Sequence, residues 1–440
     1  MTMQDQAKAS PTKAFFVQML VKDVSLISAV MDLVDNCIDG AMRIRGDGRF
    51  DNLSVWIKLN QDEFEIKDNC GGMSVKLAKE DAFKFGRSTD APVIKSSVGL
   101  FGVGMKRAIF KMGKKFSVTS TWSRSWFEVS ENVEDWLDRD EAEWTFPIRY
   151  ELYTDDVPED DRGTIIKVCD LYDGVKNQFA DPLFASSLER EVADKEQTFL
   201  ERGLNIKING ISIIPSTPKF AYTSDGSLLP AREDKPYDGV AVRLFSGVGE
   251  REVDKAGWYV YCNGRMVVKA DQTSLTGWGE MGTTRIPRYH HQFARFVGCA
   301  FFDSEDSSRL PWNTTKDGLD VEHDIYRTVK LRMVSMMPPV IDFLNRVDKE
   351  LDEPNEDKRV LNKLLEEVEY LPPTTELPVA QSFTYVKPQP VPKRPQTVSI
   401  QYERPKDLAD LAKKCLKARS YRRVGEKTFD WYIENECQDE

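Results

Sequence analysis

Residues 29 to 42, AVMDLVDNCIDGAM, place three acids and an amide in a stretch that otherwise has the pattern of a buried helix. At about 100° of rotation per residue, Asp32, Asp35, Asn36 and Asp39 fall on one side of the helix, and the apolar residues fall on the other. Solvated faces usually carry Lys, Glu and Arg, because Asp and Asn are weaker helix formers. Taken alone, the stretch fits either a solvated polar face or a functional site.

A second stretch, IKDNCGGMS, places Asp68 at the end of a predicted strand, directly before a turn that contains Gly71 and Gly72. Glycines at such a point allow a sharp turn or a close approach of the backbone to a flat group. The carboxylate of Asp68 could accept a hydrogen bond from an exocyclic amine. A plain turn is the alternative interpretation of this stretch.

The third stretch, GLFGVGMK, contains Gly99, Gly102 and Gly104 directly before a predicted helix. Glycines at this spacing expose backbone N–H groups and the positive end of a helix, which suit phosphate. Flexible loops also collect glycine, and the spacing is not that of the dinucleotide-binding fingerprint. The sequence contains no Walker lysine pattern either.

The elements around these stretches favour an α+β fold. Alternating or apolar segments predict strands at 53–59, 63–68, 115–122, 126–131 and 163–171, and helices are predicted at 75–86 and from the glycine-rich loop to Gly113. Helices mixed with antiparallel strands indicate an α/β sandwich rather than a doubly wound sheet.

The rest of the chain predicts a second folded block and a tail. A charged helix is expected within 184–203, strands at 239–246, 257–269 and 295–303, and a long helix at about 320–351. Eight prolines between Leu371 and Pro405 indicate an extended arm, and a short basic helix is expected at 408–420. The predicted domains are residues 1–172, 173–352 and 353–440.

Composition excludes several classes of protein. A net charge of −11 argues against wholesale coating of nucleic acid. Seven cysteines without a CxxC pair predict neither a disulfide framework nor a zinc site, and three histidines leave little room for a His-based centre. The absence of a long apolar run or a signal region predicts a soluble, cytoplasmic protein. Residues 387–427 carry twelve Lys or Arg against four acids, so this segment either contacts an anionic partner or folds back on the acidic body.

Taken together and in order, the stretches resemble the boxes of the GHKL superfamily, which includes gyrase, the ninety-kilodalton heat-shock chaperone, histidine kinases, MutL and MORC-type ATPases. DLVDNCIDGA is similar to the first box, DNCGGM to the second, GLFGVG to the lid loop and RGTIIKV to the fourth. The resemblance implies a Bergerat-type α/β sandwich that binds ATP over residues 1–172.

The resemblance also implies roles for individual residues. Asp32 would be the catalytic acid, Asn36 the Mg²⁺ ligand and Asp68 the acceptor for the adenine amine, supported by Thr164 through its hydroxyl or a water. The full set implied for nucleotide binding is Asn36, Asp39, Asp68, Gly72, Met73, Gly99, Gly102, Val103, Gly104, Lys106 and Thr164.

The second block resembles the transducer domain of MutL and MORC-like proteins. VYCNGRMVV is similar to its strand and turn, and LPWNTTKDGLD to the loop that delivers a catalytic lysine, here Lys316, to the nucleotide. An ordinary surface lysine is the alternative for Lys316. The transducer domain is expected over residues 173–352, followed by an extended tail.

Two positions depart from the family pattern. Asp32 stands where the family usually has Glu, and a shorter side chain pulls the carboxylate back from a water that a base must reach within about 3 Å. Either hydrolysis is slow or the backbone sits closer, and Asp35 is the reserve candidate for the base. Cys70 occupies the position of the family's first glycine, so the turn after Asp68 is expected to differ.

The expected function is an Mg-ATP hydrolase that uses ATP to dimerise and close as a clamp on nucleic acid or a protein partner. By resemblance, residues 1–20 would pack across the dimer interface, and the basic arm would contact the partner. Bacterial antiviral defence or DNA maintenance would suit such a protein. The alternative is an ATP-sensing regulatory or chaperone-like subunit with little turnover.

Overall fold

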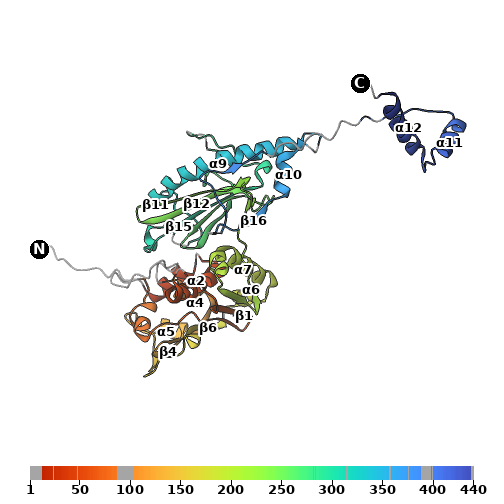
Figure 1. Ribbon diagram of the computed structural model, residues 1–440. Helices are drawn as coiled ribbons and strands as arrows, with labels where there is room; N and C mark the ends of the chain where they lie inside the picture. The colour runs from red at the N-terminus through yellow and green to blue at the C-terminus, as the bar shows by residue number, and fades with distance from the viewer. Residues whose placement is uncertain are drawn as a thin grey trace. The chain divides into compact units, whose positions relative to one another are not determined.

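The computed structural model describes residues 12–22, 24–46, 48–86, 103–280, 282, 284–313, 316–355, 358–374, 376–387, 398 and 400–437. The chain divides into two compact units, Met1–Gln389 and Pro390–Glu440. Figure 1 labels the elements of both units.

The first unit contains an eight-stranded sheet in the order β5-β4-β3-β6-β2-β1-β7-β8. All neighbouring strands are antiparallel except β1 and β7, which run parallel. The strands are β1 Ser54–Leu59, β2 Glu63–Asp68, β3 Gly113–Trp122, β4 Ser125–Asn132, β5 Ile148–Leu152, β6 Gly163–Leu171, β7 Asn205–Ile208 and β8 Ile211–Ser212. This mixed, antiparallel-rich architecture agrees with the predicted α+β fold.

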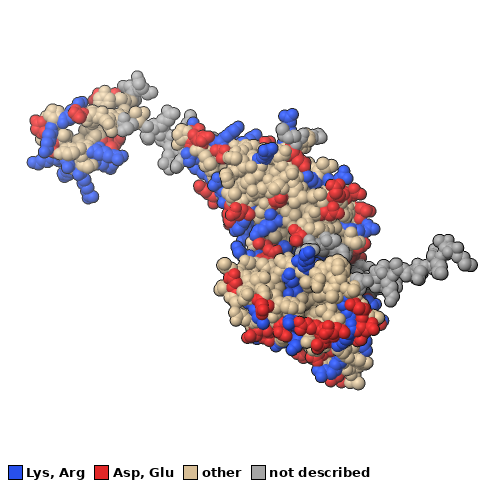
Figure 2. Space-filling model, turned by 180° about the vertical axis from the view of Figure 1, so that it is seen from behind, with Lys and Arg blue, Asp and Glu red and all other residues tan. Residues whose placement is uncertain are grey.

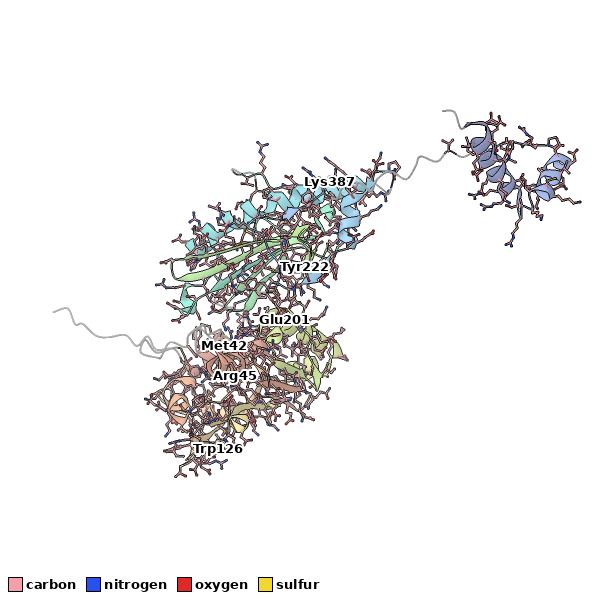
Figure 3. The ribbon with its side chains drawn as sticks, in the orientation of Figure 1. Met42, Arg45, Trp126, Glu201, Tyr222 and Lys387 are labelled. Carbon is pink, nitrogen blue, oxygen red and sulfur yellow. The ribbon has the colours of Figure 1, made fainter. Side chains whose placement is uncertain are left out.

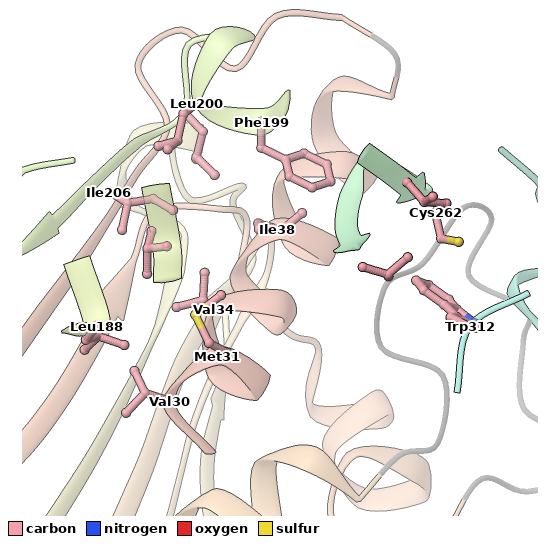
Figure 4. Packing of buried hydrophobic residues seen from close by; sticks show 14 of the residues in the cluster. Val30, Met31, Val34, Ile38, Leu188, Phe199, Leu200, Ile206, Cys262 and Trp312 are labelled. Atoms are coloured by element: carbon pink, nitrogen blue, oxygen red, sulfur yellow. The ribbon is translucent and has the colours of Figure 1, made fainter. Parts of the chain in front are cut away.

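Helices α2 (Leu26–Arg45) and α4 (Gly104–Met112) pack against each other and against this sheet. Ser25 caps α2, because its hydroxyl accepts a hydrogen bond from the Ser28 backbone N–H at 3.0 Å. Figure 4 shows Val30, Met31, Val34 and Ile38 on α2 among the buried apolar side chains of this core. The apolar side of α2 is therefore fixed, and its acidic side faces away from that packing.

Further helices complete this part of the unit. They are α1 Lys13–Lys22, α3 Val75–Leu77, α5 Val133–Leu137, α6 Asp173–Ala180, α7 Pro182–Lys195 and α8 Gln197–Glu201, with a π-helical turn at Ala78–Ala82. The first sheet includes residues beyond the expected domain boundary at residue 172. After α6, α7 and α8 the chain forms β7, which pairs with β1. Ile206 and Ile208 of β7 are fully buried, so burial of these side chains keeps the strand in this sheet.

A second sheet of the first unit has the order β11-β12-β15-β13-β14. Its strands are β11 Ala231–Tyr237, β12 Val240–Val248, β13 Gly257–Cys262, β14 Arg265–Asp271 and β15 Phe296–Asp303. Helix α9 (Asp324–Leu351) packs on it, and the hydroxyl of Ser246 donates to the Met336 carbonyl at 3.0 Å. That carbonyl belongs to the α9 segment that contains Pro338 and Pro339.

Residues 358–374 and 376–387, which the sequence assigned to the arm, lie in the first unit. Helix α10 (Val360–Glu366) precedes β16 (Glu369–Leu371), which pairs with β9 (Phe220–Tyr222), while β17 (Thr384–Tyr385) pairs with β10 (Leu228–Leu229). Figure 3 labels Tyr222, whose hydroxyl donates to Glu369 at 2.7 Å, and Lys387, which follows β17 near the end of this unit. Proline-rich backbone is extended, and in this segment it includes the short paired strands β16 and β17.

The described residues of the second unit form two helices, α11 (Lys406–Cys415) and α12 (Tyr421–Glu436). Neither helix has a buried residue. Among the described residues, none of the helices is long and apolar enough to span a membrane.

Candidate nucleotide site

The polar side of α2 carries three buried carboxylates and one exposed amide. Asp32, Asp35 and Asp39 are 9%, 1% and 6% exposed, whereas Asn36 is exposed. Buried carboxylates are costly without partners, so each must be explained by what surrounds it. A solvated polar face does not describe this side of the helix.

Asp32 is held by Arg107 of α4. The Arg107 guanidinium donates to Asp32 Oδ2 through Nη2 at 2.5 Å and through Nε at 3.1 Å. Burial raises the pKa of Asp32 above its ordinary value, the charges of Arg107 and Lys316 oppose that rise, and Asp35 adds to it. The expected catalytic acid is therefore already engaged through one of its two oxygens.

The beginning of α4 lies directly against Asp32. A side chain added at Gly104 would place its Cβ 3.2 Å from both Cβ and Cγ of Asp32 and 3.4 Å from Oδ1. Such contacts are tighter than ordinary packing, so glycine at this position permits the close approach. The N-terminal end of a helix also carries partial positive charge, which favours a carboxylate or a phosphate nearby.

Asp35 has different partners from Asp32, and it connects α2 with the second sheet. Its Oδ1 accepts a hydrogen bond from Arg265 at the start of β14, and its Oδ2 accepts one from Lys316 Nζ at 2.9 Å. Both cations are themselves buried. The reserve candidate for the base is thus engaged by two cations from the part of the chain beyond the first sheet.

Lys316 adopts a left-handed backbone conformation with φ 57°. A non-glycine residue holds this conformation at some cost and only when its surroundings demand it. Its ammonium group is directed to Asp35, and its charge also acts on Asp32. The structure therefore brings the lysine of the predicted loop to the acidic side of α2, and an ordinary surface lysine does not describe it.

Glu196, between α7 and α8, completes a buried ion network. Its Oε1 accepts from Arg265 Nη1 at 2.7 Å, and its side chain is fully buried. Burial raises the pKa of Glu196 to about 7, although Arg265 opposes the rise. Within the described part of the chain, Glu196 Oε2 and Arg265 Nε lack hydrogen-bond partners.

Asp68 lies at the end of β2 and is almost fully buried. Its Oδ1 accepts from the Cys70 backbone N–H at 2.8 Å. Burial raises the pKa of Asp68 to about 6, while hydrogen bonds from the Cys70 backbone, the Cys37 thiol and the Thr164 backbone oppose the rise. Cys70, the departure from the family pattern, thus helps to fix this carboxylate through its backbone.

The backbone N–H of Thr164 hydrogen-bonds to Asp68, and support of Asp68 through the Thr164 hydroxyl or a water stays a prediction. That hydroxyl lies 3.0 Å from the Ser120 hydroxyl, which also accepts from the Met73 backbone N–H at 2.8 Å. Gly72 has φ 67°, and a Cβ there would lie 2.0 Å from the Thr121 carbonyl oxygen. The turn of the second box is thus held tightly against β3 and β6.

The remaining residues of the predicted nucleotide-binding set do not contact Asp32, Asp35 or Asp68 through any hydrogen bond described above. Lys106 is buried, its ammonium donates to the Ala82 carbonyl at 2.8 Å, and burial lowers its pKa to about 7. Val103 directly precedes α4, and the Asp39 carbonyl accepts from Arg43 Nε at 3.3 Å. Gly99 and Gly102 lie outside the described residues.

The residues present fit Mg²⁺ bound with phosphate. Asn36 offers an exposed amide oxygen one helical turn from Asp32, and Mg²⁺ typically takes one or two protein oxygens together with phosphate and water. Among the described residues, no group of three or more His, Cys, Asp or Glu side chains could hold a metal by itself. A metal site here would depend on the nucleotide.

Sequence reasoning missed Arg107, Arg265 and Glu196. Arg107 follows Gly104 by three positions, so helical spacing could have placed it on the same side of α4. Arg265 lies in the quoted transducer-like segment, but no local signal showed that it would be buried. Glu196 lies in a charged helix pattern that resembles a solvated surface.

An acidic helix, a buried Asp at a strand end and a glycine-started helix lie together on one antiparallel-rich sheet, an arrangement consistent with an ATPase domain of the GHKL type. Residues 24–164 match the family model described as "Histidine kinase-, DNA gyrase B-, and HSP90-like ATPase". This match supports the GHKL superfamily for that segment and implies nucleotide binding. No curated protein matches the chain.

Proposed function

We propose that this protein binds and hydrolyses Mg-ATP at the acidic side of α2. The observation that supports this most strongly is the convergence of Asp32, Gly104 and Arg107 within the segment that matches the ATPase family. The carboxylate lies beside the N-terminal end of α4, where phosphate is favoured. Asp68 supplies a separate buried acceptor for the purine.

Different residues have different roles in binding and hydrolysis. Asp68 accepts from the adenine amine, and Asp32 orients and deprotonates the attacking water. Asn36 would hold Mg²⁺, which supplies positive charge against the phosphates when it is bound with ATP. Backbone N–H groups at the start of α4 and the ammonium groups of Lys106 and Lys316 bind the phosphates; Lys106 and Lys316 must leave Ala82 and Asp35 to do so.

The second sheet senses the nucleotide through Asp35. Arg265 and Lys316 both contact this carboxylate, which lies one turn along α2 from Asp32. Transfer of Lys316 to the γ-phosphate would leave Asp35 with Arg265 alone. Nucleotide state would then alter the contact between α2 and the transducer-like part, which is a two-state arrangement of the kind that drives conformational switching.

ATP binding closes two copies of the chain into a clamp on nucleic acid or a protein partner, in bacterial antiviral defence or DNA maintenance. The dimer contact would involve residues 1–20, of which 1–11 lie outside the described residues.

Figure 2 shows Lys and Arg side chains gathered on the second unit. Between 413 and 427 they are Lys413, Lys414, Lys417, Arg419, Arg422, Arg423 and Lys427, with Glu426 as the sole acid. This charge suits an anionic partner.

An ATP sensor with little turnover is the second candidate, and the Arg107–Asp32 pair is the observation that favours it. The Arg107 guanidinium occupies Asp32 Oδ2 and opposes the rise that burial causes in the pKa of this carboxylate, so it favours a weaker base. In that case ATP would bind and change the arrangement of the chain without frequent hydrolysis.

Phosphate release with and without duplex DNA tests these proposals together with light scattering. We expect turnover that DNA stimulates, and a doubling of mass with Mg²⁺ and a non-hydrolysable ATP analogue. Asp32→Asn should bind ATP but release no phosphate. ATP binding without turnover would favour the sensor, and normal turnover by Asp32→Asn would remove Asp32 from its role.

A further inference from the structure

The position of Arg107 bears on how an aspartate could serve where a longer acid is usual. Arg107 and Gly104 are three residues apart on α4, so they face the same way. A Cβ at Gly104 would lie 3.2 Å from the Asp32 side chain, so glycine lets the helix start close to it, and Arg107 binds the far oxygen of the same carboxylate. One helix thus contacts Asp32 at two points.

The two oxygens of Asp32 are not equivalent. Both hydrogen bonds from Arg107 go to Oδ2. Oδ1 is the oxygen nearest the Gly104 position, and it accepts no hydrogen bond from the residues that the structure describes. The carboxylate is therefore fixed through one oxygen and has the other directed to the beginning of α4.

Resting on the proposed function, we propose that Arg107 is a positioning residue for ATP hydrolysis, which fixes Asp32 so that Oδ1 receives the proton of the attacking water. In that reaction the water oxygen bonds to the γ-phosphorus, and the bond from this phosphorus to the bridging oxygen breaks. The bonding electron pair stays on ADP, and the proton of the water passes to Oδ1. Arg107 itself touches neither water nor phosphate.

Burial supports a role in orientation rather than a surface contact. The side chains of Arg107 and Asp32 are 16% and 10% exposed. Two N–H donors from one planar guanidinium restrict the rotation of the carboxylate, which a lysine ammonium at this position could not do as well. The neighbouring cation, Lys106, is directed to the Ala82 carbonyl and does not contribute to this pair.

The test compares Arg107→Ala, Arg107→Lys and Gly104→Ala with the full-length wild type. Calorimetric titration measures ATP affinity, and phosphate release measures kcat. We expect Arg107→Ala to lower kcat about 10- to 100-fold, the usual effect of a misplaced catalytic group, and to leave ATP affinity unchanged. Arg107→Lys should recover part of the loss, and Gly104→Ala should lower kcat by displacing Asp32.

Lys111→Ala is the matched control, because it removes a cation one turn further along α4 whose ammonium donates to the Val21 carbonyl. It should retain wild-type kcat. The proposal is overturned if Arg107→Ala keeps or exceeds the wild-type kcat, or if it loses ATP affinity instead. If Arg107→Ala does not fold, the same measurements on Arg107→Lys and Gly104→Ala decide. A kcat at or above that of the wild type in both variants then overturns the proposal. A wild type that binds ATP but releases no phosphate would instead overturn hydrolysis itself.

Discussion

At the residue scale, the side chain of Asp32 is contacted by α4 at two points. Gly104 brings the start of α4 against Asp32, and Arg107 fixes the orientation of the carboxylate. That a closer backbone compensates for the missing methylene stays a prediction, and the close contact between the start of α4 and Asp32 supports it.

Asp68 is expected to make ATP binding depend on pH. Its pKa is raised to about 6, so the carboxylate accepts from an amine above pH 6 and loses this ability as the pH falls through 6. ATP affinity measured by titration should therefore fall between pH 7.5 and 5.5. Asp68→Asn should weaken binding about 10- to 100-fold at neutral pH, consistent with loss of one hydrogen bond to a charged group.

The same variant also provides the control, because Asp68→Asn should remove the fall in ATP affinity that protonation of Asp68 causes between pH 7.5 and 5.5. Asp62→Asn, at an exposed position just before β2, should behave as the wild type. Unchanged affinity in Asp68→Asn would show that Asp68 does not contact the nucleotide.

At the scale of elements, α2 serves both the core and the site. Its apolar side packs into the core, while its acidic side receives cations from α4, β14 and the loop of Lys316. Periodicity predicted both sides of this helix from the sequence. It could not predict that Asp32 and Asp35 would have different partners. The partner of Asp32 lies 75 positions away in the sequence, and the two partners of Asp35 lie 230 and 281 positions away.

Arg265→Ala should destabilise the first unit strongly. The change would leave Asp35 and Glu196 buried without their shared guanidinium, and breaking a buried ion network in this way costs about 3–5 kcal/mol. The free energy of unfolding in urea measures the loss. Arg243→Ala, which breaks an exposed pair with Asp303 in the same sheet, should cost under about 1 kcal/mol. Equal effects of the two changes would contradict the structural role of the network.

At the scale of the whole molecule, the sequence predicted most elements but placed their boundaries less well. The strand at 163–171 and the helix that ends before Gly113 occur as expected. The first sheet nevertheless takes β7 and β8 from residues 205–212, and residues 358–387 add α10, β16 and β17 to the first unit. Both differences arise from long-range strand pairing, which local patterns do not encode.

The second unit is expected to supply affinity for nucleic acid without affecting basal turnover. Changing Lys414, Lys417, Arg419 and Arg422 together to Gln should reduce the slope of log affinity against log salt by about 3 to 4, because each lost phosphate contact removes about 0.9. These side chains are exposed. Phosphate release without DNA should remain at the wild-type rate, and an unchanged salt dependence would rule out this surface.

We expect a purine triphosphate to bind between the acidic side of α2, the turn after Asp68 and the beginning of α4. Hydrogen–deuterium exchange of the wild type, with and without Mg²⁺ and a non-hydrolysable ATP analogue, tests this binding site. Exchange at residues 29–42, 68–73 and 103–107 should be slower when the analogue is present. Unchanged exchange in these three segments at a saturating concentration, or protection confined to other parts of the chain, would contradict it.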